Sequence, residues 1–514
     1  MEKESRVKKT VLNAKMNLIC YFISLITAFF TRKILLDYLG AEFIGLTGTL
    51  GSLLSFLNLA ELGIGTAIGY VLYKPIADGD KFKINEVISV LGYHYRKIGY
   101  TIFVGGDILS FFLPLIFPDT SFSLGVVYVG FYAYLTTSLI GYFVNYHAAL
   151  LSADQRNYIV TGFFQMTTTS KVILQMLLAI YTGSFYVYLL VELLSGIINA
   201  SILNWKINKT YPWLKSEIKL GRGLYKKYPE ISTYTKQIFA HRIGGVVQGQ
   251  LTPFLIYTFV SLPVVALYTN YTLLTQKVES LISATINSTS AAVGNLIAEG
   301  DKGKILKVFR ELLALRMFIA SIVAACIYTL SSPFIGVWLG EEYILPNSVT
   351  ALIAILSGLG IARGVLDQFC YGSGLFADIW APYAESAIMA AFAVVGGSQW
   401  GLAGVLLGPL ASIIAIIYIW KPYYLFSRGF KLSVFKYWNL FLTHIIISYI
   451  TFITTDVIYT SLMQQKVYAN NWGNLIINGC IYTFIMTTVI FAGYYLTSKG
   501  FRDIVGRIKL FKKR

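Results

Sequence analysis

The sequence predicts an all-α integral membrane protein of fourteen transmembrane helices, arranged as two parallel six-helix bundles followed by two extra helices. Three observations predict this fold. The 514 residues are 56% hydrophobic and only 13% charged, whereas a soluble domain is about 45–50% apolar. Apolar runs of about 20 residues, the length that crosses a hydrocarbon core as a helix, recur along the chain. A short loop also occurs twice, at 77–84 and 298–305, which predicts two similar halves.

The repeated loop sets the relation between the two halves. Its copies lie 221 positions apart and match at seven of eight positions when Asp and Glu are treated as equivalent. Because six predicted spans separate the copies, both halves have the same orientation, related by an axis along the membrane normal. Acidic and basic residues alternate in each copy, so we weigh a latch of ion pairs between the bundles against plain solvated turns. Exposed ion pairs contribute little singly, which favours the turns.

The predicted spans divide the chain into five parts. Those of the first half lie near residues 17–31, 44–72, 98–116, 124–148, 158–180 and 185–203. Those of the second half lie near 238–259, 264–296, 312–330, 349–370, 380–395 and 402–420, and two more lie near 437–455 and 475–496. The expected parts are an N-terminal bundle (1–205), a basic interfacial linker (206–236), a C-terminal bundle (237–421), the two extra helices (422–498) and a basic tail (499–514).

The net charge of +17 has an uneven distribution. If the amino end is cytoplasmic, 36 of the 42 Lys and Arg residues lie in cytoplasmic segments; of the other six, Arg32, Lys33 and Lys466 lie on the outer side, and Lys171, Lys277 and Arg363 lie inside predicted spans. The positive-inside rule therefore predicts that both termini and both loop copies are cytoplasmic. The amino end has no small-residue cleavage site, so its apolar continuation is expected to be a retained span. Nucleic-acid binding is not expected, because no basic face on a soluble domain is present.

The sequence carries no catalytic or metal-binding pattern. The four cysteines lie in or beside apolar runs without paired spacing, which supports neither a disulfide framework nor a metal site. A P-loop, a serine nucleophile elbow and a carboxylate-rich magnesium site are also missing. We therefore expect neither an enzyme nor a cofactor, and any transport would draw on an ion gradient or on the substrate's own gradient.

Ionisable groups inside the spans are the main candidates for function. Such a group costs about 2.5–3.5 kcal/mol at the bilayer centre, so it needs a partner or a watery cavity. The candidate substrate-binding cations are Lys171, Lys277 and Arg363, and Lys171 is favoured because its own span offers no carboxylate at helical spacing. Arg363 and Asp367 are four residues apart, which fits mutual neutralisation and a transport role equally well. The carboxylates considered for ion coupling are Glu61, Asp107, Glu192, Glu279 and Asp367.

Polar residues at steps of three and four form stripes along the first and seventh spans. These spans hold equivalent places in the repeat, which predicts a cavity that both halves line. The predicted lining is Asn13, Asn17, Thr27, Thr168, Gln175, His241, Gln248, Gln276 and Asn287. For any single Ser or Thr, bonding to a helix backbone is the favoured alternative. A structural role is likewise the default for His241, although a near-neutral pKa would suit proton coupling.

Several apolar motifs resemble Wzx-type polysaccharide flippases. They lie at 32–40, 43–46, 60–67, 73–75 and 400–404. This family belongs to the MOP exporter superfamily, with the MATE-type multidrug extruders and the lipid II flippases. The resemblance implies two six-helix bundles that rock about a central, often cationic cavity. It also implies translocation of an undecaprenyl-diphosphate-linked oligosaccharide from the cytoplasmic to the outer leaflet of a bacterial inner membrane, for capsule or O-antigen synthesis.

The resemblance extends to partners and to the extra helices. Lipid II flippases also carry two extra helices, which help to form a groove for the lipid tail; their arginine-rich first helix is replaced here by an Asn and Thr stripe. Cations in a partly dehydrated cavity would bind the diphosphate. The expected partners are the lipid-linked oligosaccharide, H⁺ or Na⁺ as a coupling ion, and polysaccharide assembly proteins, with the chain itself a monomer.

Two other functions are weighed against the flippase. A cation-coupled multidrug extruder of the same fold would use Glu61, Asp107 and Glu279, but such extruders more often have twelve spans. A membrane-embedded glycosyltransferase or polymerase would need a large outer loop with paired acidic or arginine residues. The longest outer segments, 341–346 and 456–471, are short.

Overall fold

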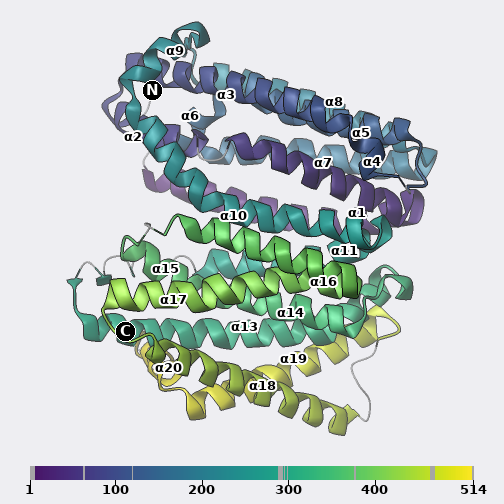
Figure 1. The fold of residues 1–514 in the computed structure, drawn as a ribbon, viewed down its shortest axis with the longest axis vertical. Coiled ribbons are helices and arrows are strands. Elements are labelled where there is room, and N and C mark those ends of the chain that lie inside the picture. The colour runs from purple at the N-terminus through teal and green to yellow at the C-terminus, as the bar shows by residue number, and fades with distance from the viewer. Residues whose placement is uncertain are drawn as a thin grey trace. The chain divides into compact units, whose positions relative to one another are not determined.

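The computed structural model describes residues 6–61, 64–118, 120–154, 156–286, 293, 296–297, 299–375, 378–463 and 469–511. In these ranges every regular element is a helix (Figure 1). The chain forms two compact units, Met1–Ala266 and Leu267–Arg514. The division into two six-helix bundles, a linker and extra helices stays a prediction.

The first unit is built on a long first helix. Helix α1 packs against α7 and α10, while α5 packs against α3 and α8. A buried apolar cluster joins α2, α3, α6 and α8, with Ile88, Leu91 and Leu151 fully enclosed. The helices of this unit are α1 (Arg6–Leu57), α2 (Ile64–Asp78), α3 (Lys81–Ser110), α4 (Leu113–Ile116), α5 (Leu124–Phe143), α6 (Ala148–Ala153), α7 (Asn157–Thr182), α8 (Phe185–Thr210), α9 (Gly221–Leu224) and α10 (Pro229–Phe259).

The second unit is organised around α13, which packs against α14, α18, α19 and α20. Part of its core is aromatic: the ring of Phe309 lies 5.1 Å from that of Phe369 and 5.4 Å from that of Phe426. The helices are α11 (Leu262–Ile286), which begins in the first unit, α13 (Lys302–Trp338), α14 (Asn347–Ala362), α15 (Gly364–Gly372), α16 (Trp380–Ser412), α17 (Lys421–Tyr424), α18 (Phe435–Met463), α19 (Trp472–Thr497) and α20 (Lys499–Phe511). Two π-helical stretches, Ile413–Trp420 and Leu425–Phe430, flank α17.

Two glycines divide helices that otherwise run without a loop. Gly40 has φ +82° inside α1, and Gly401 has φ +54° inside α16. Only glycine adopts such backbone angles at little cost. The turn predicted at 400–404 is thereby confirmed as a helix break. The predicted span 44–72 runs as two helices, because a 3₁₀ turn at Asn58–Glu61 separates α1 from α2.

Both copies of the repeated loop form the same turn. Gly79 and Gly300 have φ +71° and +76°. The following Asp80 and Asp301 each accept backbone N–H bonds that begin α3 and α13, at 3.0 Å from Lys83 N and from Gly303 N. The backbone N–H bond from Lys304 lowers the pKa of Asp301 below its ordinary value. These carboxylates therefore cap their own helices.

Within the described residues, nine helical segments are long and apolar enough to cross a membrane. They lie at Lys15–Leu57, Leu124–Phe143, Asn157–Thr182, Phe185–Thr210, Lys302–Trp338, Asn347–Gly372, Trp380–Phe430, Phe435–Met463 and Trp472–Thr497. The first and the seventh each contain one of the glycine breaks. The chain is thus a multi-pass membrane protein, and the count of fourteen spans stays a prediction.

Candidate functional site

The strongest candidate cation, Lys171, forms an ion pair between α7 and α8. Its Nζ lies 2.8 Å from Glu192 Oε1, and the two side chains are only 19% and 11% exposed. The buried Gln175 donates to the other carboxylate oxygen at 3.1 Å and to Tyr188 O at 3.2 Å. The structure therefore brings three predicted residues together. Since an ammonium has three N–H donors, the bond to Glu192 leaves two for another acceptor.

Two other candidate carboxylates of the first unit are bonded by tyrosine hydroxyls. Glu61 accepts from Tyr95 at 2.7 Å and from Tyr142 at 3.1 Å. Asp107 accepts from Tyr132 at 3.1 Å. A carboxylate held by hydroxyls keeps its bonding partners whether or not it carries a proton. These bonds tie Glu61 to α3 and α5, and Asp107 of α3 to α5.

In the second unit the candidates form two separate groups. Arg363 Nε lies 3.4 Å from Asp367 Oδ2, and Lys421 from α17 donates to the other oxygen of the same carboxylate. Two cations thus share one carboxylate, and the buried carboxylate of Glu385 also lies near Arg363. Glu279 of α11 accepts from Ser357 of α14 at 2.5 Å. Lys421 was not a candidate, because it lies 54 positions from Asp367 at the predicted end of a span.

Two buried charges at the start of α13 were also missed. Arg316, which is 3% exposed, donates to Ile361 O at 3.2 Å. It lies over Gly364, where an added Cβ would sit 2.1 Å from the guanidinium. Glu311, which is 2% exposed, pairs with Arg507 of α20 at 2.8 Å. Arg316 was counted with the cytoplasmic Lys and Arg residues, and Glu311 was not a candidate, although apolar residues flank both of them.

The predicted polar lining is only partly described. Thr27 bonds the carbonyl of Ile23 in its own helix at 2.6 Å, which is the structural role favoured for a single hydroxyl. Asn17 and Gln276 are exposed, while Thr168 and Lys277 are half-buried. The side chains of Asn13, His241 and Gln248, and the whole of Asn287, lie outside the described residues. The cavity lined by both halves stays a prediction.

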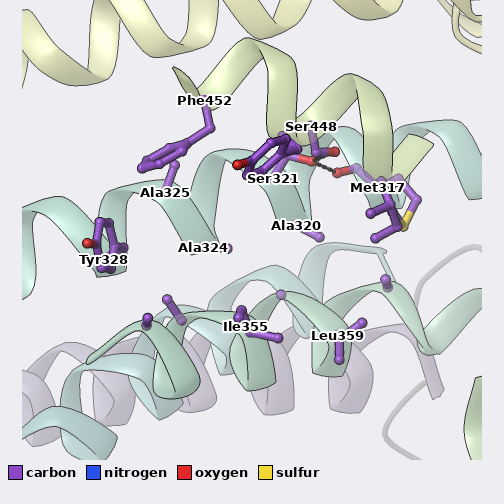
Figure 2. A pocket seen from close by; sticks show the side chains of 16 residues that line it. Met317, Ala320, Ser321, Ala324, Ala325, Tyr328, Ile355, Leu359, Ser448 and Phe452 are labelled. Carbon is purple, nitrogen blue, oxygen red and sulfur yellow. Dashed lines mark hydrogen bonds between the residues drawn. The ribbon is translucent and has the colours of Figure 1, made fainter. Parts of the chain in front are cut away.

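An apolar groove of about 400 Å³ lies between α13, α14 and α18 (Figure 2). Ala320, Ala324 and Ala325 of α13 form one wall, and Phe452 of α18 forms another. Because these α13 side chains are small, they leave space between the three helices. A hydrogen bond of 2.5 Å between Ser321 and Ser448 ties α13 to α18 beside the groove.

Three solved structures of membrane transport proteins match this fold. No protein-family model and no curated relative matches the sequence. The structure matches that of the lipid II flippase MurJ in an inward closed conformation, with a TM-score of 0.59 and 14% identity over 95% of this chain and 99% of that one. It also matches an inward-facing multidrug resistance MATE family transporter of the MOP superfamily, with a TM-score of 0.60 and 16% identity over 78% of this chain and 94% of that one.

A third match is a point mutant of the Vibrio cholerae MATE transporter VcmN, with a TM-score of 0.51 and 12% identity over 83% of this chain and 99% of that one. At these identities the matches show a shared fold. The chain therefore shares the fold of this lipid II flippase and of these MATE transporters.

Proposed function

We propose that this protein flips an undecaprenyl-diphosphate-linked oligosaccharide from the cytoplasmic to the outer leaflet of a bacterial inner membrane, by alternating access, for surface polysaccharide synthesis. The observation that carries the proposal is the apolar groove between α13, α14 and α18. One of its walls comes from α18, the first of the two helices beyond the predicted twelve-span unit. The lipid II flippase match also covers 95% of the chain, against 78% and 83% for the two MATE transporters.

The groove suits a hydrocarbon chain that lies along a helix. Its α13 lining runs from Met317 to Tyr328. These eleven steps rise about 16 Å, since each residue of an α-helix adds about 1.5 Å. That length is close to half of a hydrocarbon core of about 30 Å. A lipid tail in this groove would be shielded along one leaflet while its headgroup crosses elsewhere.

The headgroup is proposed to bind the cations inside the spans. Lys171 keeps two N–H donors beyond its bond to Glu192, and Arg363 shares Asp367 with Lys421. A diphosphate can therefore join either group without first breaking every ion pair, and charge-assisted bonds to phosphate are strong. Lys277 is the third proposed cation. Asn, Gln and Thr side chains of the predicted lining would bond the sugar hydroxyls.

Filling the groove tests this function. Ala324→Phe and Ala351→Phe place a ring in the space meant for the tail, so the rate of lipid-linked glycan flipping in proteoliposomes should fall by about tenfold or more, since a bulky side chain blocks a matched apolar site. Ala391→Phe on the exposed face of α16 is the matched control and should leave the rate unchanged. Equal rates in all three folded variants would contradict a role for the groove.

A multidrug extruder of the same fold is the second candidate. Glu61 and Glu279 favour it, because both carboxylates are bonded by hydroxyls and could exchange an ion for a cationic drug. Proteoliposomes that extrude a lipophilic cation under an ion gradient, and that move no lipid-linked glycan, would select this function.

A further inference from the structure

A second cavity, of about 900 Å³, lies in the first unit between α3 and the linker that follows α8. Four cations line it: Arg96 and Lys97 from α3, and Lys219 and Arg222 from the linker. Its other lining residues are Tyr93, Tyr100, Thr101, Val104 and Ile218, so none of the residues that line it is acidic. Figure 1 shows the linker helix α9 beside α3.

Specific contacts hold the linker in this place. The backbone N–H of Lys215 donates to Asn85 Oδ1 at 2.7 Å, and that of Glu217 donates to Ser89 Oγ at 2.9 Å. Gly221 lies so close to α3 that an added Cβ would sit 2.4 Å from Ser89 O. The linker cations are therefore brought to the α3 cations by a fitted interface and not by a loose tail.

The assembled charges repel one another. Bringing like charges together in a cavity is unfavourable unless an anion joins them. The nearby Lys227 is already paired with Glu86 at 2.7 Å, and this carboxylate does not reach the cavity wall. Burial, helped by the Lys97 ammonium, lowers the pKa of His94, so that this imidazole adds no positive charge at neutral pH. All four cations of this open cavity are exposed to solvent, and an anion bound among them would reduce their mutual repulsion.

An exposed apolar stripe continues from the cavity along the same face of α3. Tyr100, Val104, Ile108 and Phe111 follow one another at helical spacing and are 61%, 54%, 56% and 78% exposed. The stripe is about 16 Å long at about 1.5 Å per residue. This matches a single leaflet, which is half of a hydrocarbon core of about 30 Å. A ligand with one anionic end and a chain of one-leaflet length fits both parts.

We propose that this site binds an anionic glycerophospholipid of the leaflet on the basic side of the membrane. Its phosphate lies among Arg96, Lys97, Lys219 and Arg222, and one acyl chain lies along the α3 stripe. The bound lipid bridges the linker and α3 through its phosphate. The site is separate from the groove proposed for the transported lipid, because its lining residues belong to α3 and the linker.

Lipid retention by the purified full-length protein tests the site. Native mass spectrometry would compare phosphatidylglycerol with phosphatidylcholine for the wild type, for Lys219→Gln/Arg222→Gln and for the control Lys431→Gln/Lys436→Gln. The control removes the same charge from exposed positions outside the cavity. Phosphatidylglycerol should bind the wild type and the control alike and the linker variant about 20-fold more weakly, because each cation near an anionic lipid contributes about fivefold. Lys219→Arg/Arg222→Lys should retain binding.

Three results would overturn the proposal. The first is equal binding of phosphatidylglycerol by the linker variant and the wild type in folded, monodisperse samples. The second is no preference for phosphatidylglycerol over phosphatidylcholine in the wild type. The third is binding of undecaprenyl diphosphate that depends on Lys219 and Arg222 and that phosphatidylglycerol does not displace, which would assign the cavity to the transported lipid.

Discussion

Lys171 and Glu192, which lie 21 positions apart on neighbouring helices, form an ion pair of 2.8 Å in which both side chains are largely buried. A buried pair is costly to break from one side, because the remaining charge stays in a poor solvent. Its replacement by two apolar residues costs far less. Replacing both residues therefore tests headgroup binding by Lys171 without the loss of stability that a single replacement causes.

Removing one partner should destabilise the protein, and removing both should not. Glu192→Gln should lower the free energy of unfolding by about 2–3 kcal/mol, whereas Lys171→Met/Glu192→Met should stay near wild type. Thermal unfolding in detergent measures both. If Lys171 binds the diphosphate, the folded double variant should still flip lipid-linked glycan about tenfold more slowly, the loss expected for one charge-assisted bond.

The exposed pair Lys33 and Asp37 supplies the control, since its atoms are 3.5 Å apart and its side chains are 50% and 46% exposed. Lys33→Met/Asp37→Met should change neither stability nor flux. Wild-type flux in the double variant at 171 and 192 would remove Lys171 from the proposed headgroup site.

The fold should remain stable when Glu61 loses its charge. Glu61→Gln keeps one oxygen that accepts from Tyr95, and its amide N–H can donate to the hydroxyl oxygen of Tyr142, so its thermal stability should change by less than about 1 kcal/mol. If Glu61 couples transport to an ion, the variant should lose the dependence of flux on pH or Na⁺ that the wild type has. Glu42→Gln, at a carboxylate that bonds Ser121, is the control. An unaltered ion dependence in Glu61→Gln would exclude this coupling role.

Gly221 should be needed for the contact between the linker and α3. An added methyl group would lie 2.4 Å from Ser89 O, so Gly221→Ala must move the linker, at a cost of about 1–3 kcal/mol. Trypsin should then cut the linker faster. Gly223, where an added Cβ meets nothing within 4 Å, offers the same substitution two residues away without a clash. Equal cleavage of the two variants would show that the linker does not dock in this way.

The pair between Glu86 and Lys227 should make linker docking sensitive to acid. Burial raises the pKa of Glu86, but hydrogen bonds from Lys227 and Tyr228 outweigh it, so the pKa lies below the ordinary value of 4.5. A carboxylate whose pKa is lower in the folded than in the unfolded protein stabilises the fold at any pH above its unfolded-state pKa. That stability is lost as the pH falls through the folded-state pKa. The melting temperature of the wild type should therefore fall more steeply below pH 4.5 than that of Glu86→Gln. If the melting temperatures of the two proteins fell in parallel with pH, the Glu86–Lys227 pair would not stabilise the docked linker.

Local patterns predicted the helices and the repeated turn, because their causes lie within a few residues. The repeated loop was favoured as a plain turn, and both copies form one, at Gly79–Asp80 and Gly300–Asp301; that each Asp also caps the following helix was not predicted. Apolar runs likewise placed helices where the structure has them. The 3₁₀ turn at Asn58–Glu61 was missed, because it is held by side chains from other helices, such as Ser138 and Tyr142.

Pairing between helices could not be predicted from spacing along one helix. Lys171 had no partner in its own span, and its true partner, Glu192, became visible only once α7 and α8 were packed. The same holds for Lys421 with Asp367 and for Arg507 with Glu311. The cations of the α3 cavity were counted as part of a basic cytoplasmic surface, because the fold of the linker alone brings them together.

The flux of a defined lipid in proteoliposomes tests the central claim most directly. Purified wild-type protein should move a fluorescent undecaprenyl-diphosphate-linked oligosaccharide between leaflets, and it should leave a lipophilic cationic drug where it was added. Movement of the drug without movement of the lipid-linked glycan, by protein with the correct thermal stability, would contradict the flippase account.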